Sequence, residues 1–350
     1  MIINIGNVKI GEKNPIAVQS MATVSAADHD ACIKQINALQ DAGCDIVRIA
    51  IPDEESAKAV SIIKEKTSVP LVADIHFDFR LALMCIERGI DKVRINPGNI
   101  GSEENTAKVA KAAKAKNIPV RIGVNGGSLE KSLLLKYGSA TPEAMVESAV
   151  NQIAVLNKYD FNDIVISLKS SSVKKTIDAY RLAKKTFDYP LHLGVTEAGT
   201  YPFGLIKSAI GIGSLLADGI GDTIRVSLTD DPIKEPAAAR EILNALGMGS
   251  PHIEVVSCPT CARCRINLID IAKEVNEKVK DIPYSLKVAV MGCAVNGPGE
   301  ARDADIGIAG GDGCALLFKK GEIVGKFKED EIIDVLLTEI GKMTSKKGND

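Results

Sequence analysis

Apolar runs rich in β-branched residues alternate with longer amphipathic stretches from residue 16 to residue 246. A short run of this kind predicts a strand, and a stretch whose apolar residues recur every three or four positions predicts a helix. The predicted strands are 16–20, 46–51, 71–75, 92–96, 120–124, 164–168, 191–195 and 223–228. The predicted helices are 28–40, 54–66, 79–88, 103–116, 142–157, 173–186, 203–216 and 233–246.

Strict alternation of strand and helix indicates parallel strands that are joined by helical crossovers. Consecutive units of this number and total length are typical of a (β/α)8 barrel. An open, doubly wound sheet is the rival arrangement, but it rarely uses so many consecutive units without an antiparallel edge strand. We therefore predict an α/β fold with a TIM-type (β/α)8 barrel over residues 1–248.

The pattern changes after Gly247-Met-Gly-Ser-Pro251, whose glycines and proline indicate a linker. Further strands are predicted at 253–257, 286–291, 305–308, 315–319 and 322–326, and helices at 266–280 and 330–340. The last two strands read as a hairpin that turns at Lys320-Gly321. These elements predict a small α+β domain over residues 249–350.

The composition is that of an ordinary globular protein. Of the 350 residues, 45% are hydrophobic and 25% are charged. A net charge of −2 gives no reason to expect nucleic acid or a membrane surface as a partner. No apolar run is long enough for a transmembrane helix, and residues 1–5 lack the features of a signal peptide. Because eight cysteines without such a signal indicate a reducing compartment, we predict a cytoplasmic protein.

Three cysteines form the most specific motif. Cys258 and Cys261 make a C-x-x-C pair, and Cys293 follows the predicted strand 286–291. One tight turn can present the pair to a single metal centre, and a neighbouring strand end would bring the third thiolate. Three thiolates with one further ligand suit an iron–sulfur cluster or a structural zinc ion. At this level the fourth ligand is either Cys264 or Glu300.

Two features favour a cluster over zinc. Zinc ribbons usually pair one C-x-x-C with a second, whereas Cys293 stands alone. Glu300 offers a carboxylate, a replaceable ligand that suits a cluster which must open to substrate. The C-x3-C-x2-C motif of radical S-adenosylmethionine enzymes does not occur in the sequence. The other cysteines are expected to be buried apolar side chains: Cys32, Cys44, Cys85 and Cys314.

Basic residues gather at the carboxyl ends of the predicted barrel strands, where active sites of this fold lie. Five strands each carry one at or near that end: Arg48, Arg94, Arg121, Lys169 and Arg225. Alternation of side chains along a strand adds Asn96, Asn125 and Ser227 to the same faces. Like charges at one mouth repel and need an anion to offset them. Because the arginine fork matches phosphate oxygens, this ring predicts a phosphate-rich or diphosphate ligand.

Other polar residues near the strand ends complete the predicted site. Asp74 and His76 share a face at the end of the third strand, and Gln19 lies on the first. His76 is a candidate donor to phosphate or substrate. Glu197 closes the seventh strand opposite several cations, so we expect it to be ionised and to act as a substrate contact or proton donor. The other histidines have no such context and are expected to be structural: His29, His192 and His252.

These motifs resemble the 4-hydroxy-3-methylbut-2-en-1-yl diphosphate synthase family, the iron–sulfur enzymes of the non-mevalonate isoprenoid pathway. The most specific segments are Ser257-Cys-Pro-Thr-Cys261 and Met291-Gly-Cys-Ala-Val-Asn-Gly-Pro-Gly-Glu300. The resemblance spans almost the whole chain through Val18-Gln-Ser-Met21, Asp74-Ile-His76, Val93-Arg-Ile-Asn-Pro-Gly98, Arg121-Ile-Gly-Val-Asn125, Ser167-Leu-Lys169, Gly194-Val-Thr-Glu197 and Ile224-Arg-Val-Ser227. The form of the family that the sequence resembles is the shorter, two-domain bacterial form.

The resemblance implies a [4Fe–4S] cluster held by Cys258, Cys261, Cys293 and Glu300. The implied substrate is 2-C-methyl-D-erythritol 2,4-cyclodiphosphate, bound by Arg48, His76, Arg94, Arg121, Asn125, Lys169, Arg225 and Ser227. Two electrons from ferredoxin or flavodoxin would open its ring and expel a hydroxyl as water, with Glu197 as the nearby acid and Glu300 displaced by a substrate oxygen. The family further implies a head-to-tail homodimer in which one chain's cluster domain caps the other chain's barrel. Cys264 departs from the family pattern and is expected to be a bystander.

Two other functions remain open at this point. A corrinoid- or pterin-dependent methyltransferase would also place an anionic ligand in a barrel and can carry a cluster; binding of corrinoid or pterin instead of the cyclic diphosphate would favour it. A non-catalytic scaffold with a structural zinc ion would contain zinc, and its metal content would not depend on Glu300.

Overall fold

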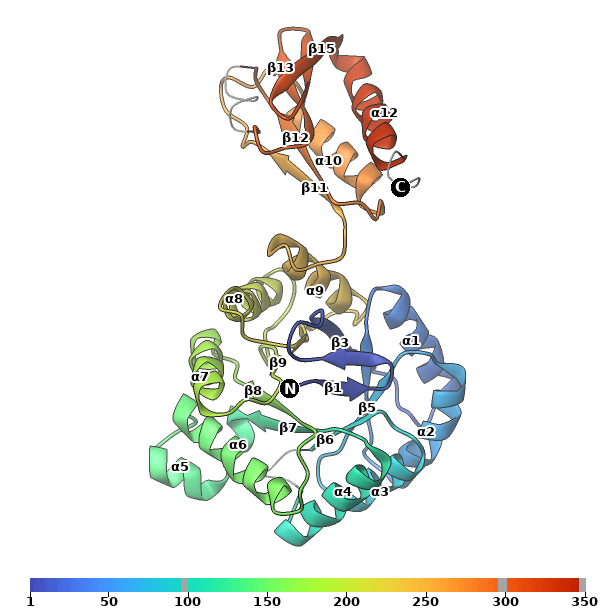
Figure 1. Ribbon diagram of the computed structural model, residues 1–350, viewed down its shortest axis with the longest axis vertical. Coiled ribbons are helices and arrows are strands. Elements are labelled where there is room, and N and C mark those ends of the chain that lie inside the picture. The colour runs from blue at the N-terminus through green and yellow to red at the C-terminus, as the bar shows by residue number, and fades with distance from the viewer. Residues whose placement is uncertain (96–99, 295–300, 346–350) are drawn as a thin grey trace. The chain divides into compact units, whose positions relative to one another are not determined.

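The computed structural model describes residues 1–95, 100–294 and 301–345. The chain divides into two compact units, Met1–Met248 and Gly249–Asp350, and each is described by itself. The first unit is coloured from blue to yellow in Figure 1, and the second from yellow-orange to red.

The first unit is built around an eight-stranded parallel sheet (Figure 1). In pairing order the strands are β8 (Ile164–Lys169), β7 (Val120–Asn125), β6 (Lys92–Ile95), β5 (Leu71–Asp74), β4 (Ile46–Ala50), β3 (Ala17–Met21), β10 (Thr223–Ile224) and β9 (His192–Leu193). A parallel bridge between Ile166 on β8 and Leu191, next to β9, brings the two ends of this sheet together. The sheet therefore closes into a ring, which confirms the predicted barrel and excludes the open doubly wound sheet.

Helices surround this ring (Figure 1). They are α1 (His29–Asp41), α2 (Glu54–Lys66), α3 (Phe79–Glu87), α4 (Glu103–Lys116), α6 (Pro142–Asn157), α7 (Val173–Thr186), α8 (Phe203–Ala217) and α9 (Lys234–Ala245). Their starts were predictable because many are capped: the side chains of Asp53, Ser102, Thr141 and Ser172 each accept a hydrogen bond from the backbone N–H three residues further on. In the described part of the chain, no helix is both long and apolar enough to cross a bilayer.

An N-terminal hairpin that was not predicted closes the amino-terminal end of the barrel. It consists of β1 (Ile3–Ile5) and β2 (Val8–Ile10), which pair antiparallel. Ile3, Ile5 and Ile10 cluster with barrel residues that include Ala17 and Ile46, the first residues of β3 and β4. Burial of this apolar face seals the barrel interior on the side opposite the strand ends that were expected to bind substrate.

Other elements differ from the prediction in detail. A short 3-10 turn, Gly126–Ser128, and a helix, α5 (Lys131–Tyr137), lie between β7 and α6, where no element was predicted. Strands β9 and β10 end at Leu193 and Ile224, before the predicted ends at 195 and 228. The residues beyond these two ends leave the ladder and enter the loops that face the candidate site.

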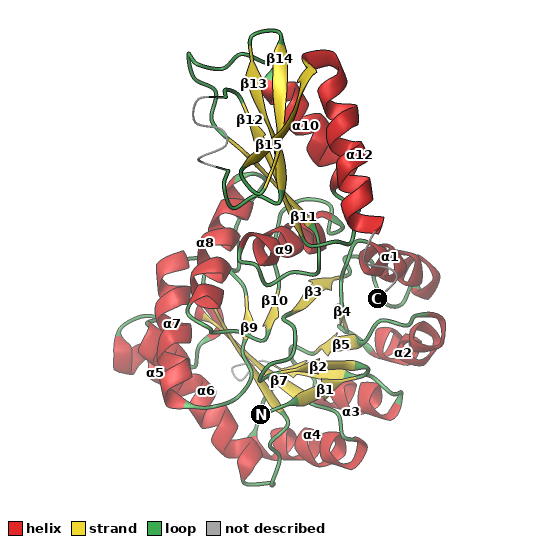
Figure 2. Cartoon of the chain, turned by 45° about the horizontal axis from the view of Figure 1, so that its top comes forward, coloured by secondary structure: helices red, strands yellow, loops and turns green. Residues whose placement is uncertain are grey.

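Among its described residues, the second unit contains a five-stranded mixed sheet and the helices α10 and α12 (Figure 2). The strands pair in chain order: β11 (Ile253–Ser257), β12 (Leu286–Met291), β13 (Ile306–Gly311), β14 (Cys314–Lys319) and β15 (Glu322–Lys328). The first three run parallel, and β13, β14 and β15 are antiparallel neighbours. Helices α10 (Leu268–Val279) and α12 (Ile332–Ser345) contribute Val275 and Leu336 to the apolar core of this unit. The predicted α+β architecture is confirmed.

Candidate functional site

The carboxyl ends of the barrel strands enclose a cavity of about 260 Å³. Nine residues of the predicted site line it: Arg48, Asp74, His76, Arg94, Arg121, Asn125, Lys169, Arg225 and Ser227. Met21, Ser167 and Thr196 also line it and were not predicted. The first two were detectable, because Met21 lies two residues after Gln19 and Ser167 two before Lys169 on the same strand faces. The described lining carries five basic side chains and one carboxylate, that of Asp74.

Asp74 connects several of these side chains. It ends β5 and is only 2% exposed. Arg94 Nη1 donates to Asp74 Oδ1 over 2.8 Å, and Arg48 Nε lies 3.6 Å from Oδ2. His76 Nε2 lies 3.3 Å from Oδ2 and must donate, because a carboxylate only accepts. Burial would raise the pKa of Asp74, but Arg48, His76 and Arg94 outweigh it and hold that pKa well below its usual range. The ionised carboxylate thus orients these donors.

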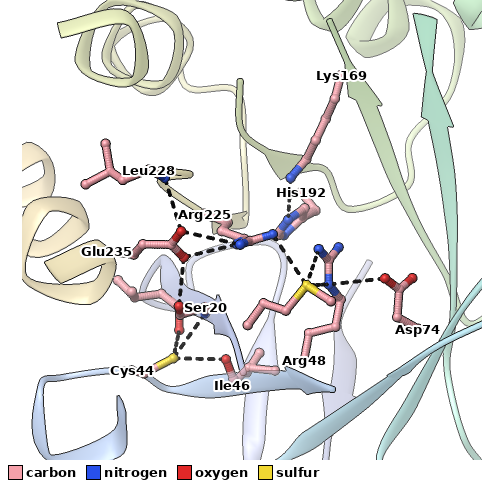
Figure 3. Close-up of polar contacts among 12 residues, drawn as sticks. Ser20, Cys44, Ile46, Arg48, Asp74, Lys169, His192, Arg225, Leu228 and Glu235 are labelled. Atoms are coloured by element: carbon pink, nitrogen blue, oxygen red, sulfur yellow. Dashed lines mark hydrogen bonds and ion pairs between the residues drawn. The ribbon is translucent and has the colours of Figure 1, made fainter. Parts of the chain in front are cut away.

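Glu235, near the start of α9, accepts hydrogen bonds from Arg225. No feature of the sequence pattern had identified Glu235 as part of the site. Glu235 is 3% exposed, and its two carboxylate oxygens accept from Arg225 Nε over 3.2 Å and from Nη2 over 3.4 Å. Ser20 Oγ and the backbone N–H of Leu228 donate to the same carboxylate over 2.8 and 3.1 Å (Figure 3). These bonds offset the cost of burying the charge, so Glu235 can fix the direction of the Arg225 guanidinium.

The sulfur of Met21 lies between two of the guanidinium groups. Arg48 Nη2 is 2.8 Å from Met21 Sδ, and Arg225 Nη1 is 3.8 Å from the same atom. A thioether is only a weak acceptor. The N–H groups that it contacts therefore remain available to a stronger acceptor such as a phosphate oxygen.

Arg121 carries the least compensated charge in the cavity lining. It is fully buried, and no described residue accepts a hydrogen bond from its Nε or Nη1. Burial, together with the nearby cations Arg48 and Arg94, acts to lower the pKa of its guanidinium. Arg121 is the second residue of β7, so it reaches the cavity from deeper in the barrel than the predicted position near the strand end. An anion in the cavity would supply the missing acceptors.

Two glycines make room for the ends of these basic side chains. A Cβ atom at Gly123 on β7 would lie 2.5 Å from Arg94 Nε, and one at Gly194 would lie 2.8 Å from Lys169 Nζ. Both glycines belong to the motifs that resemble the synthase family. Their role is steric, because the guanidinium and the amine occupy the space that any larger residue would need.

Four further predicted residues are not among the described residues that line the cavity. Gln19 is 1% exposed, and its amide has no hydrogen-bond partner among the residues described; it shares a strand face with Met21 but lies deeper. Glu197 is exposed, lies outside the residues that line the cavity, and has a left-handed backbone with φ of 51°. Asn96 lies outside the described residues, as does Glu300 of the second unit. The structure leaves the roles of these four residues as predictions.

Lys92 is a buried cation that the sequence interpretation missed. It begins β6, is 0% exposed, and has no hydrogen-bond partner for its Nζ in the described structure. Burial lowers the pKa of Lys92 well below its usual value, and the charges of Arg121 and Arg48 lower it further. Its spacing from Arg94, two residues along the same strand, was the signal that could have identified it.

In the second unit, the cysteines follow two adjacent parallel strands. Cys258 comes directly after β11, and Cys293 lies two residues after β12. Gly292 N–H donates to Cys258 Sγ over 3.2 Å, so the two segments meet beside the cysteines. The thiol of Cys264 points to a backbone carbonyl, donating to Ile266 O over 3.2 Å. The expectation that Cys264 is a bystander stays a prediction.

The donor set was tested for its fit to a metal cluster. The described residues contain no group of three His, Cys, Asp or Glu side chains close enough to hold a metal ion, and Glu300 lies outside them. The chemistry nevertheless fits, because Cys258, Cys261 and Cys293 are free and at least partly exposed, and a backbone N–H already points to the Cys258 sulfur. By contrast, Cys32, Cys44 and Cys85 are buried as expected, and burial raises the pKa of Cys44 to about 12. Cys314 is partly exposed, so its expected burial was wrong.

Comparison with known proteins gives two family matches in succession along the chain. Residues 1–240 match the GcpE TIM-barrel domain, and residues 254–342 match the GcpE protein C-terminal domain. Together these two matches cover both units.

Curated relatives match over nearly the full length. One from Caldanaerobacter subterraneus subsp. tengcongensis is 58% identical, and the match covers 99% of this chain and 97% of the relative. One from Fusobacterium nucleatum subsp. nucleatum is 56% identical over 98% of this chain and 96% of its own. Both are named 4-hydroxy-3-methylbut-2-en-1-yl diphosphate synthase (flavodoxin).

Solved structures with similar folds share little sequence. Type I 3-dehydroquinate dehydratase from Clostridium difficile matches with a TM-score of 0.51 and 14% identity, over 70% of this chain and 97% of its own. The spore coat polysaccharide biosynthesis protein SpsE of Bacillus subtilis matches with a TM-score of 0.50 and 12% identity, over 72% and 75%. At such identities the likeness extends to the fold alone.

The resemblance that the motifs indicated is therefore confirmed, and the family match favours neither a methyltransferase nor a zinc scaffold. Both units match in the expected order, and relatives more than half identical cover almost every residue. The chain belongs to the GcpE family, that of the 4-hydroxy-3-methylbut-2-en-1-yl diphosphate synthases.

Proposed function

We propose that this protein reductively opens the ring of 2-C-methyl-D-erythritol 2,4-cyclodiphosphate and forms 4-hydroxy-3-methylbut-2-enyl diphosphate and water. Two electrons and a proton enter the reaction, and we propose flavodoxin, the donor in the relatives' names, or ferredoxin as the source of the electrons. The observation that supports this most is the cavity. Five basic side chains line it against one carboxylate, and Arg121 retains N–H groups that have no acceptor among the described residues.

The chain's own residues would bind and orient the diphosphate. Guanidinium groups bind phosphate oxygens in pairs, and charge-assisted hydrogen bonds of this kind are about twice as strong as neutral ones. Asp74 and Glu235 already fix the directions of Arg94 and Arg225. Because these groups are held in place before the ligand arrives, little additional order is required on binding, and the ring carbon–oxygen bond can be presented in one orientation.

Cys258, Cys261, Cys293 and Glu300 would hold the [4Fe–4S] cluster. When bound, such a cluster supplies the two electrons of the reduction and a Lewis-acidic iron. Cys258 and Cys293 would be delivered by the adjacent ends of β11 and β12. The Gly292 N–H that reaches Cys258 Sγ would stabilise the thiolate form of that cysteine.

Glu197 is our candidate for the proton donor. Its left-handed backbone, φ 51°, is unfavourable for a residue with a side chain, and strain of this kind is found at functional sites. Thr196, its neighbour, lines the cavity. A carboxyl group on this loop could therefore reach the ligand after a local change of the loop.

We also propose that two chains associate head to tail, so that the cluster unit of one serves the barrel of its partner. This arrangement, Asn96 and Gln19 as further ligand contacts, and a cytoplasmic location follow from the family resemblance and the sequence.

The direct test is the metal content of protein purified without oxygen. We expect about four irons and four sulfides per chain, as a [4Fe–4S] cluster requires, with a brown colour that dithionite bleaches. Glu300→Ala should keep the fold and lose iron. Stoichiometric zinc in colourless protein without sulfide would contradict the proposal.

A further inference from the structure

A histidine lies behind Lys169 in the barrel. Lys169 is the last residue of β8, and its Nζ lies 3.3 Å from Nε2 of His192, the first residue of β9 (Figure 3). His192 is fully buried and is not among the residues that line the cavity, whereas Lys169 is. The histidine that was expected to be structural therefore contacts a predicted substrate ligand.

The hydrogen bonds around His192 assign its tautomer. Burial and the cations around it, Arg121 and Lys169 foremost, hold the pKa of the imidazole well below its usual value, so the ring is neutral. A neutral imidazole has one donor and one acceptor nitrogen. When Lys169 is charged, as binding to a phosphate requires, its ammonium can only donate, so Nε2 is the acceptor. Nδ1 therefore carries the hydrogen and donates to Thr223 Oγ1, which lies 2.8 Å away on β10.

Strands β8 and β9 are neighbours in the barrel, and Lys169 and His192 lie on either side of the junction between them, called the seam below. In the described structure its ladder consists of the bridge between Ile166 and Leu191. Further along, the Tyr180 hydroxyl from α7 lies in the seam, where it accepts from Leu168 N–H over 3.0 Å and donates to the backbone carbonyl of His192. Tyr180 thus replaces a rung of the ladder directly beside Lys169 and His192.

On the cavity side, Lys169 Nζ occupies the space that a side chain at Gly194 would fill, since a Cβ there would lie 2.8 Å from it. Arg121, Arg48, Arg225 and Arg94 all act to lower the pKa of Lys169, in addition to burial. An amine in such surroundings needs an acceptor to hold it in place. Among the described residues, His192 Nε2 is the acceptor that lies within hydrogen-bond distance of Lys169 Nζ.

We propose that His192 is a positioning residue for Lys169: its neutral ring accepts one hydrogen bond from the amine and directs the remaining N–H groups to an anionic ligand in the cavity. This inference rests on the proposed function, because the ligand is taken to be the cyclic diphosphate. Thr223 Oγ1 accepts the Nδ1 hydrogen on the other side of the ring, and Tyr180 bridges the two strands beside the pair.

Two amide substitutions of His192 distinguish a hydrogen bond to Lys169 from a role in packing alone. In His192→Gln the longer side chain can place its carbonyl oxygen near the position of Nε2, whereas in His192→Asn the shorter one reaches only toward Thr223. We would measure the Kd of 2-C-methyl-D-erythritol 2,4-cyclodiphosphate by calorimetry on the cluster-containing protein, and its KM and kcat. We expect His192→Asn to weaken binding about tenfold and raise KM with little change in kcat, and His192→Gln to recover most of the affinity.

The same pair is then placed in a Lys169→Met background. If His192 acts through Lys169, the difference between the Gln and Asn variants disappears there, since the interacting partner is gone. A difference that persists, or equal affinities of the two amides with Lys169 present, would overturn the inference. If Lys169→Met alone binds the substrate as tightly as the unaltered protein, the diphosphate does not bind at Lys169, and the proposed function of the cavity fails instead.

Discussion

At the scale of single residues, the site consists of cations that the barrel buries without enough carboxylates to neutralise them. Arg121 is the clearest case, because its Nε and Nη1 have no acceptor among the described residues. Asp74 and Glu235 are already engaged by Arg94 and Arg225. An anion in the cavity would supply the acceptors that these buried N–H groups lack, and its binding is therefore favourable.

Replacing Arg121 tests whether these buried cations bind the anionic ligand. We expect Arg121→Met to raise the Kd of the cyclic diphosphate about 10- to 100-fold, because a hydrogen bond to a charged group contributes about 1.5–3 kcal/mol. The protein should still fold, since methionine fills much of the space and removes an uncompensated buried charge. Calorimetric titration measures the effect, and Arg80→Met, at an exposed position on α3, is the control. Unchanged affinity in Arg121→Met would exclude a contact with phosphate.

Lys92 gives a prediction about stability. An unpaired buried amine costs about 1–3 kcal/mol, so Lys92→Met should raise Tm at pH 7, whereas the exposed Lys131→Met should not. In the unfolded chain Lys92 has its ordinary pKa of 10.5, and in the fold its pKa is well below that. Folding therefore releases a proton between these two values, and the stability of the unaltered protein rises with pH across that window.

It follows that the gain in Tm from Lys92→Met should shrink as the pH approaches 10.5. Calorimetric melting at pH 7 and pH 9.5 would measure it. A gain that is the same at both pH values would mean that Lys92 keeps its ordinary pKa in the fold.

The sequence predicted those residues of the site that lie on strands at even spacing and carry a charge, such as Arg94 and Lys169. It could not predict the residues that hold them. Glu235 comes from the first turn of a helix, where an acidic residue is usually explained by the helix dipole. The role proposed for His192 depends on a contact between two neighbouring strands, β8 and β9, and spacing along one strand does not report such contacts.

At the scale of elements, glycines let strands carry long basic side chains across the barrel interior. Gly123→Ala would place a Cβ 2.5 Å from Arg94 Nε and displace this guanidinium from Asp74. We expect about a tenfold loss of affinity for the cyclic diphosphate, which is the effect of losing about one charged hydrogen bond. The iron content should be unchanged. Gly213→Ala on α8, where a Cβ meets no atom within 4 Å, is the matched control. Equal binding by the two variants would show that Arg94 is not held by this packing.

Helix positions followed closely from the sequence because their caps and apolar periodicity are local. The predicted bounds of α2, α4, α6 and α7 agree with the structure. The N-terminal hairpin was missed, since its short strands are stabilised by burial against the barrel and not by a local signal. Strands β9 and β10 were predicted too long because apolar residues continue past the point where the ladder ends.

At the scale of the whole molecule, we expect ligand binding in the first unit and cluster binding in the second. Head-to-tail association can be tested with mixed dimers of Arg121→Met, which impairs the barrel, and Cys293→Ser, which impairs the cluster. If the units work between chains, each purified mixed dimer has one intact pair, so about half of the unaltered activity should return. Activity is measured at a substrate concentration well below the raised Kd of Arg121→Met, where both parent proteins are impaired. If the units work within one chain, the mixed dimer has no intact pair and stays as impaired as its parents.

The central claim is that this chain reduces the cyclic diphosphate. The most direct measurement is anaerobic incubation of the iron-loaded protein with 2-C-methyl-D-erythritol 2,4-cyclodiphosphate and reduced flavodoxin, with the products identified by mass spectrometry. The account predicts 4-hydroxy-3-methylbut-2-enyl diphosphate, formed at the expense of two flavodoxin electrons per molecule and lost in Cys293→Ser. Unchanged substrate in the presence of an intact, reducible cluster would contradict it.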